Sequence, residues 1–427
     1  MLYLAVALLV VVSVGGLSLP QQHVEYGVMF DAGSTGTRVR IYSYTWDNSV
    51  PLGIKNMVQV SSMKVRPGLS SLLNNVSGIQ NYLQPLMDMA SSSVPKAQQA
   101  ETPILFMATA GMRFEPQDES EKVLDEVRRL FRHPSFNPFN YTQPNVQVLS
   151  GEEEGVYAWV ALNYILGYFD SIKPVNETAG IMEMGGGSTQ IAFIPEDQPY
   201  EGEYSVILAK RKFDLYVHSY LNYGTNGIQR QVAEELVRIQ EPDNPCVLKG
   251  DSKSFLLQKG SYVQMNGTGE PNFCELLLWP LIEPEYGIEC EPKPCAIKNQ
   301  YMPELPSIPF YALQGFAYAA KDLGVLGEES SLDLRKMLEN GTEYCRQTLQ
   351  EAIAAGASLE YASQNCLISL YTPLLLEGVY NVREVNQLKA PLDINGRRIE
   401  WAMGALIVDI SEMKTGIYSA VSPRRRR

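Results

Sequence analysis

Two stretches of the chain share one order of apolar and polar positions. Each has an apolar strand, a carboxylate, a glycine-rich loop and a second apolar strand. The first stretch, FDAGSTGTRVRIYSY, begins at Phe30, and the second, GIMEMGGGSTQIAFIPE, begins at Gly180. With Glu183 laid on Asp31, Gly185 falls on Gly33, Thr189 on Thr37, Ile191 on Val39 and Phe193 on Ile41. A hairpin turn alone could explain either loop, but the shared register predicts two related halves.

Shorter apolar runs predict further elements. Residues 104–107 and 146–149 have the composition of buried strands. Ser150 can cap a following helix, whose apolar side chains recur at helical spacing: Tyr157, Val160, Ala161 and Tyr164. Residues 309–324 and 365–382 are also helix candidates, and residues 214–224 are interpreted as the end of a helix. The segment from Cys246 to Cys295 is rich in Pro and Gly and is predicted to be irregular.

The two glycine-rich loops have the composition of phosphate-binding turns. Glycine permits close approach of the backbone to a ligand, and backbone N–H groups and hydroxyls can surround phosphate oxygens. A carboxylate at the end of each first strand can hold a hydrated divalent cation. Two such loops facing each other would clamp a phosphate chain between two domains, where ligand clefts commonly lie.

Two further side chains are candidates for chemistry. Arg113 follows a run of small residues and can contact phosphate or support a catalytic carboxylate, although an ordinary loop arginine explains it equally well. Glu152, Glu153 and Glu154 lie in the first turn of the helix after Ser150. Acidic residues there interact favourably with the helix dipole without any catalysis. The alternative is that Glu154 faces the cleft and activates water, and its position does not choose between the two.

Length and charge limit the class of protein. A chain of 427 residues is too long for one ordinary core and predicts two domains. The formal net charge of -13 argues against a nucleic-acid-binding surface. If the substrate is an anion, a metal ion or a few placed Arg and Lys residues must supply positive charge locally.

The N-terminal segment predicts entry into the secretory pathway. Residues 1–14 are almost wholly apolar and small residues follow, which is typical of a signal peptide over residues 1–18, with an uncleaved anchor as the alternative. Apart from this run, no apolar stretch has membrane-spanning length, so we expect a protein that is secreted or lies in the lumen of the endoplasmic reticulum or Golgi. Glycosylation sequons agree with this: Asn75, Asn140, Asn176, Asn266 and Asn340. The C-terminal RRRR is interpreted as a solvated tail, with a processing or retention signal as alternatives.

All six cysteines lie in the C-terminal half of the chain. Their spread, with only three histidines present, argues against a zinc site. We expect three disulfides between neighbours rather than free buried thiols: Cys246 with Cys274, Cys290 with Cys295, and Cys345 with Cys366.

Four segments in this order resemble the apyrases, or nucleoside triphosphate diphosphohydrolases. They are DAGSTGTR (31–38), ATAGMR (108–113), GEEEGVYAW (151–159) and GGGSTQ (185–190), with GFAYA (315–319) and EWAMGA (400–405) similar to C-terminal segments of the family. The resemblance implies an α/β, actin-like (ribonuclease H-like) fold of two domains, residues 25–150 plus 400–420 and residues 151–399, with a nucleotide cleft between them. It also implies hydrolysis of nucleoside di- and triphosphates with Ca²⁺ or Mg²⁺.

The same resemblance implies roles for particular residues. Glu154 would be the general base, Ser188 would orient the attacking water, and Asp31 and Glu183 would hold the hydrated metal. The phosphates would be lined by Ser34, Thr35, Thr37, Thr109, Ala110, Gly186, Gly187 and Gln190. Tyr318 and Tyr380 would stack on the nucleobase.

Three positions depart from the family pattern. Position 183 is Glu where Asp is usual, and a contact through water can absorb the extra methylene. Gly36 replaces the histidine of many cell-surface members and resembles soluble and organelle members, which often prefer diphosphates. Val379 separates Tyr380 from the preceding glycine. An exopolyphosphatase or sugar kinase of the same fold, and a nucleotide-binding protein that does not hydrolyse, are the alternatives.

Overall fold

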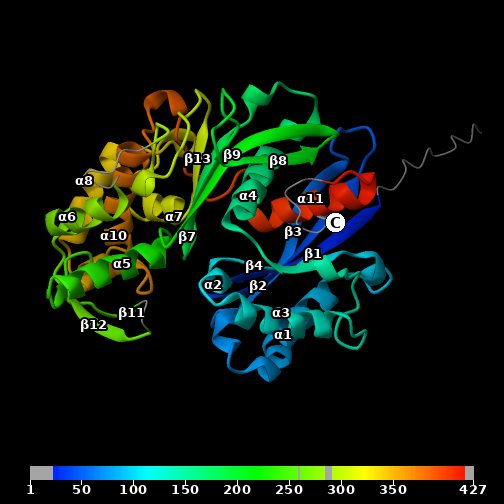
Figure 1. Cartoon of the computed structure of the whole chain (residues 1–427), viewed down its shortest axis with the longest axis horizontal. Coiled ribbons are helices and arrows are strands. Elements are labelled where there is room, and N and C mark those ends of the chain that lie inside the picture. The colour runs from blue at the N-terminus through cyan, green and yellow to red at the C-terminus, as the bar shows by residue number, and fades with distance from the viewer. Residues whose placement is uncertain (1–22, 258–259, 284–290, 419–427) are drawn as a thin grey trace, which may run out of the picture.

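The structure is a computed structural model that describes residues 23–257, 260–283 and 291–418. The predicted signal peptide, Cys290 and the RRRR tail lie outside these residues. Two five-stranded sheets with helices on their faces form the body of the protein (Figure 1). Within the described residues, no helix is both long and apolar enough to cross a membrane.

The first sheet has the strand order β3-β2-β1-β4-β5. Its strands are β1 (Val24–Gly33), β2 (Gly36–Trp46), β3 (Ile54–Val65), β4 (Ile104–Ala108) and β5 (Val146–Val148). Strands β1, β2 and β3 form an antiparallel meander, and β4 pairs in parallel with β1 and with β5. The strands predicted at residues 104–107 and 146–149 are confirmed.

The second sheet has the order β13-β6-β7-β9-β8. Its strands are β6 (Gly180–Met184), β7 (Ser188–Phe193), β8 (Glu203–Leu208), β9 (Arg211–Leu221) and β13 (Phe310–Gln314). Strand β6 forms a hairpin with β7 and pairs in parallel with β13. In each sheet, one strand, β1 or β6, thus makes a hairpin with the strand on one side and a parallel pair with the strand on the other.

The predicted repeat is confirmed in its register. Asp31 lies opposite Arg38 on the hairpin partner, and Glu183 lies opposite Gln190. The next residue in each first strand lies opposite a threonine, Thr37 or Thr189. The two carboxylates therefore occupy equivalent places in the two sheets.

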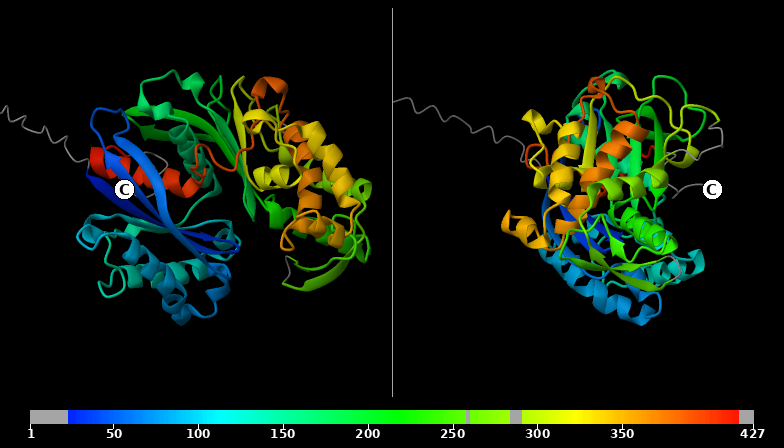
Figure 2. Two further views of the ribbon diagram at one scale, coloured as in Figure 1. Left: turned by 180° about the vertical axis from the view of Figure 1, so that it is seen from behind. Right: turned by 90° about the vertical axis from the view of Figure 1, so that its left-hand side faces the viewer.

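The helices form layers around the sheets (Figures 1 and 2). Helices α4 (Gly151–Ile165) and α11 (Trp401–Thr415) share one apolar core with residues from both sheets, so they lie between the sheets. Helices α1 (Ile79–Ser93) and α3 (Gln117–Phe131) cover the other face of the first sheet. The alternation of strand side chains explains this, because Val28 and Phe30 face one core and Met29 faces the other.

The remaining helices gather on the outer side of the second sheet, around a third core. They are α5 (Thr225–Arg238), α6 (Pro271–Ile282), α7 (Gly315–Asp322), α8 (Leu334–Cys345), α9 (Leu349–Ala354) and α10 (Ala362–Pro373), followed by a π-helical turn, Leu374–Val379. A small sheet also lies here, made of β10 (Asp243–Asn244), β11 (Ser252–Leu256) and β12 (Tyr262–Gly267). A short helix, α2 (Ala110–Arg113), follows β4.

Helices α4 and α11 pack closely because α11 has a glycine at the contact. A Cβ atom on Gly404 would lie 1.8 Å from the carbonyl oxygen of Tyr157, so any side chain there would push the helices apart. The apolar positions predicted for the helix after Ser150 all lie in α4 and are buried.

Two of the predicted disulfides are confirmed. Cys246 bonds Cys274, and Cys345 bonds Cys366. The third predicted pair includes Cys290, which lies outside the described residues.

Three predicted elements need correction. Residues 214–224 do not end a helix, because most of them belong to strand β9, where Phe213, Leu215 and Val217 are buried at alternate positions. Residues 309–324 contain strand β13 before helix α7 begins at Gly315. The segment between Cys246 and Cys295, predicted to be irregular, includes helix α6 and strands of the small sheet. The helix within 365–382 is confirmed by α10.

Candidate active site

The two glycine-rich loops face each other across the space between the sheets. A Cβ atom on Gly186 would lie 2.7 Å from Oγ of Ser34 in the first loop. One on Gly187 would lie 2.7 Å from the Cβ atom of Ala110, at the start of α2. The loops meet this closely only because both positions lack side chains. The predicted phosphate residues Ser34, Ala110, Gly186 and Gly187 are therefore brought together.

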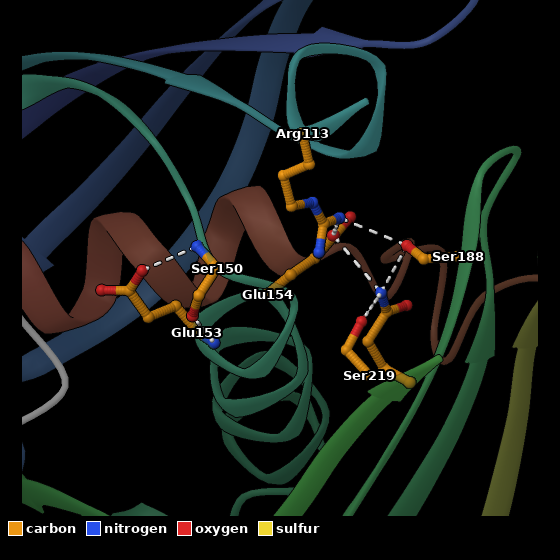
Figure 3. A network of polar contacts seen from close by, with 7 residues as sticks. Arg113, Ser150, Glu153, Glu154, Ser188 and Ser219 are labelled. Atoms are coloured by element: carbon orange, nitrogen blue, oxygen red, sulfur yellow. Dashed lines mark hydrogen bonds and ion pairs between the residues drawn. The ribbon is translucent and has the colours of Figure 1, made fainter. Parts of the chain in front are cut away.

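Helix α4 points its N-terminus at this meeting point and begins with a capping box. The Ser150 hydroxyl accepts a hydrogen bond from the Glu153 amide at 3.1 Å, and the Glu153 carboxylate accepts one from the Ser150 amide at 2.9 Å. Glu153 is thus used in capping, and Glu152 is only partly buried. Glu154 is buried and points away from the cap, as Figure 3 shows.

Glu154 belongs to a polar network that joins the two halves of the protein (Figure 3). Arg113 donates from Nη2 to Oε2 of Glu154 at 2.5 Å and to Oγ of Ser188 at 3.2 Å. The side-chain amide of Gln190 donates to the Ser188 hydroxyl at 2.7 Å and to the Ser219 hydroxyl at 3.1 Å. Arg113 therefore supports a carboxylate, which is one of the two roles considered from the sequence.

Ser219 was not identified in the sequence. It lies on β9 opposite Gln190 of β7, so the register of this strand pair brings it to the site. Gly151 makes room for it, because a Cβ atom there would lie 1.9 Å from the Ser219 hydroxyl and 2.4 Å from Nη1 of Arg113. Neither the motif around Gly151 nor the segment around Ser219 signals this contact.

Burial changes the acidity of Glu154. The loss of hydration raises the pKa of its carboxyl to about 6, the Arg113 guanidinium opposes this rise, and the Asp31 carboxylate adds to it. A carboxyl with such a pKa is still mainly ionised at neutral pH and is a better proton acceptor than an ordinary glutamate.

Asp31 and Glu183 differ in their partners. Asp31 accepts a hydrogen bond from Nη1 of Arg40 at 2.7 Å, and Arg40 also pairs with Glu400 at the start of α11. Glu183 is only 3% exposed, and among the residues that the structure describes its Oε2 atom has no hydrogen-bond partner. Burial, followed by the charges of Glu154, Asp31 and Glu400, raises the pKa of Glu183 well above its usual range. This corner of the site therefore has an excess of carboxylates over cations.

No group of three or more His, Cys, Asp or Glu side chains among the described residues is placed to bind a metal ion directly. Two carboxylates, Asp31 and Glu183, fit a different arrangement, in which an ion keeps most of its water ligands and contacts the protein through them. The unpartnered oxygen of Glu183 is an acceptor for such a contact.

Two predicted ligand residues do not fit their places in the structure. Thr37 is fully buried, and its hydroxyl lies 3.0 Å from that of Tyr82 rather than at the loop surface. Tyr380 is also fully buried, with its ring packed against Tyr220, so it presents no face to a nucleobase. Both side chains belong to the core.

The other predicted contacts lie nearer the site. Thr35 is exposed at the tip of the first loop, and Thr109 is nearly buried at the end of β4. Tyr318, on α7, is 49% exposed and lines a small cavity with Gln314, Arg398 and Glu400. Gln314 has a φ of 60°, which is uncommon for a residue with a side chain and marks local strain.

Comparisons with known proteins agree with this geometry. Residues 18–421 match the GDA1/CD39 (nucleoside phosphatase) family. The nucleoside-triphosphatase ntp-1 of Caenorhabditis elegans is 28% identical over 417 residues, which cover 92% of this chain and 75% of that protein. The probable apyrase 5 of Arabidopsis thaliana is 28% identical over 432 residues, which cover 95% of this chain and 86% of that protein.

One solved structure confirms the fold. The crystal structure of nucleoside triphosphate hydrolases from Neospora caninum superimposes with a TM-score of 0.67 at 15% identity, covering 92% of this chain and 93% of that one. The predicted α/β, actin-like architecture is therefore confirmed. The chain belongs to the GDA1/CD39 (nucleoside phosphatase) family.

Proposed function

We propose that this protein hydrolyses the terminal phosphate of nucleoside di- and triphosphates in a reaction that depends on a divalent metal. The observation that carries the proposal is the buried Glu154, held by Arg113 beside Ser188 where the two glycine-rich loops meet. Relatives named nucleoside-triphosphatase, nucleoside-diphosphatase and apyrase support the substrate class.

In the proposed mechanism, Glu154 accepts a proton from a water molecule that attacks the terminal phosphorus. Ser188 orients that water, and Gln190 fixes the Ser188 hydroxyl. Arg113 keeps the Glu154 carboxylate ionised and correctly placed. The N–H groups of both loops and the Ser34 and Thr35 hydroxyls bind phosphate oxygens, with Thr109 and Ala110 beside them. No covalent enzyme intermediate is needed.

Asp31 and Glu183 would hold hydrated Ca²⁺ or Mg²⁺, which neutralises phosphate charge when it is bound. The carboxylate excess at Glu183 supports this proposal: burial is the main cause of its raised pKa, and a cation there would reduce the repulsion from the other carboxylates that adds to it. Tyr318 remains the proposed stacking residue for the base, since its ring is exposed.

Several finer points remain part of the proposal. Gly36 favours a preference for diphosphates, by resemblance to soluble members of the family. The two disulfides support an oxidising compartment, either the secretory lumen or the outside of the cell. The division into residues 25–150 plus 400–420 and residues 151–399 is supported by the first sheet, whose strands all lie between residues 24 and 148.

The test is phosphate release from ATP, ADP, UDP and GDP by the purified protein, each with Ca²⁺, Mg²⁺ or EDTA. Turnover of at least one nucleotide that is lost in EDTA is expected. Polyphosphate, and ATP with sugar acceptors, serve as further substrates. Release from polyphosphate alone, or transfer to a sugar, would favour the rival enzymes of this fold. The absence of turnover with every substrate would leave a protein that binds nucleotides without hydrolysing them.

The pH dependence is expected to report the ionisation of Glu154. Because the base must be ionised, kcat/KM should fall about tenfold per pH unit below the folded-state pKa of about 6. The Glu154 carboxyl is influenced by Arg113, which lowers its pKa, and by Asp31, which raises it; Glu154 and Glu183 repel each other. The measurement is kcat/KM for ADP against pH at fixed metal concentration. If the apparent pKa of the acid limb of the kcat/KM profile is no higher than that of an ordinary glutamate, the expectation is contradicted.

A further inference from the structure

Three cationic side chains gather beside the first glycine-rich loop. Arg38 lies on β2 directly opposite Lys64 on β3, and Arg66 follows just after β3 ends. The Lys64 ammonium donates a hydrogen bond to the Thr35 hydroxyl at the tip of the loop, at 2.9 Å. A lysine far from the loop in sequence thus reaches a hydroxyl that is proposed to bind phosphate.

The reach of Lys64 depends on Gly36. A Cβ atom at position 36 would lie 2.4 Å from the carbonyl oxygen of Val65 and 2.7 Å from Cε of Lys64, so the β3 backbone and the lysine stem together occupy the space that a side chain at position 36 would need. The stem therefore crosses the loop and places its charge at the loop tip. Lys64 is only partly buried, so its ammonium can still contact a ligand.

The three cations are weakly compensated. Arg66 pairs with Glu360 at 3.0 Å, but both side chains are more than half exposed, and Arg38 lies 3.9 Å from Glu400. Across the described ranges, no carboxylate lies within ion-pair distance of Lys64. Burial, followed by the neighbouring charges of Arg38 and Arg66, lowers the pKa of Lys64, and the charges of Asp31 and Glu360 oppose this only in part. An anion at this place would offset the repulsion between the three cations.

We infer that Lys64 binds the phosphate chain of the nucleotide at the tip of the first loop, together with Thr35. This inference rests on the proposed function. A lysine ammonium has three donors, and Thr35 uses one, so two remain for phosphate oxygens. The contact lies beside the loop rather than at Glu154, so it contributes to binding of substrate and transition state alike. Lys64 is therefore a residue that sets KM and not kcat.

The test compares Lys64→Met, which keeps the length of the stem without the charge, with Lys64→Arg, which keeps a charge. Lys96→Met is the matched control, because Lys96 is exposed in a loop of the same half. For Lys64→Met the KM for ADP and ATP is expected to rise about tenfold or more, with kcat changed less than about threefold. Lys64→Arg and Lys96→Met are expected to keep KM near that of the unmodified protein.

A second readout does not need turnover. Pyrophosphate should raise the Tm of the unmodified protein and raise that of Lys64→Met much less. If the unmodified protein hydrolyses nucleotides while Lys64→Met keeps both its KM and its response to pyrophosphate, the inference is overturned and the proposed function stands. If no nucleotide is hydrolysed but the pyrophosphate response still needs Lys64, the proposed function fails and the anion site stands. A Lys64→Arg variant as impaired as Lys64→Met in both readouts would show that the charge is not what matters, and would also overturn the inference.

Discussion

Replacing Glu154 by Gln is expected to reduce kcat for ADP and ATP by about 10²–10⁴-fold, the usual contribution of a general base. The amide has nearly the shape of the carboxylate, so the contacts to Arg113 and the packing of α4 should survive. The amide cannot accept a proton, however, so the attacking water is not deprotonated. Single-turnover phosphate release measures this loss directly.

The matched control is Glu152→Gln, in the same helical turn but outside the network of Glu154. This variant should keep turnover within about threefold, because a partly exposed carboxylate contributes little. The rise in Tm that ADP causes measures its binding, and this rise should be the same for Glu154→Gln as for the unmodified protein. Near-normal turnover in Glu154→Gln would remove Glu154 from the mechanism.

The second large effect is expected from Arg113→Met. Without the guanidinium, Glu154 keeps its burial and its repulsion from Asp31 but loses the one charge that lowers its pKa. The carboxyl should then be protonated at neutral pH, and turnover at that pH should fall by about 10²-fold or more. Activity should recover in part at alkaline pH, because the base ionises there.

The pH profile distinguishes this role from a merely structural one. A variant that only loosens the fold would lose activity at every pH and keep the acid limb where it was. Arg132→Met, at an exposed position after α3, is the control and should leave both the limb and the rate unchanged. If the activity of Arg113→Met is reduced by the same factor at every pH and the acid limb does not shift, the proposed support of Glu154 by Arg113 is contradicted.

The sequence predicted those parts of the fold that are determined by residues close together along the chain. The duplicated loop pattern has its own register, so the equivalence of Asp31 and Glu183 follows from the spacing of residues within each loop. The cap that Ser150 provides for helix α4 is likewise encoded within one helical turn. Residues 214–224 were misassigned because their aromatic residues suit either element, and the strand is defined by its pairing with β7 and β8, which are distant or separate segments of the chain.

The parts of the site that were missed depend on contacts between distant segments. Ser219 reaches Gln190 from another strand, so no spacing along the chain could link the two. Arg113 was named from the sequence as a candidate to support a catalytic carboxylate, but only the fold brings it to Glu154. Tyr380 shows the opposite failure. The resemblance assigned Tyr380 to the base, but this residue follows directly after the π-helical turn, and packing directs its ring into the core.

The close contact between Gly404 and Tyr157 has a consequence for the order of events during synthesis. Helix α4, which carries Glu154, is made early, whereas its packing partner α11 is the last helix that the structure describes. While the chain leaves the ribosome, helix α4 therefore lacks part of the apolar core around it until about 240 further residues have been added. Nascent chains released before α11 should be inactive even though they contain every proposed catalytic residue, so premature termination would yield no partially active enzyme.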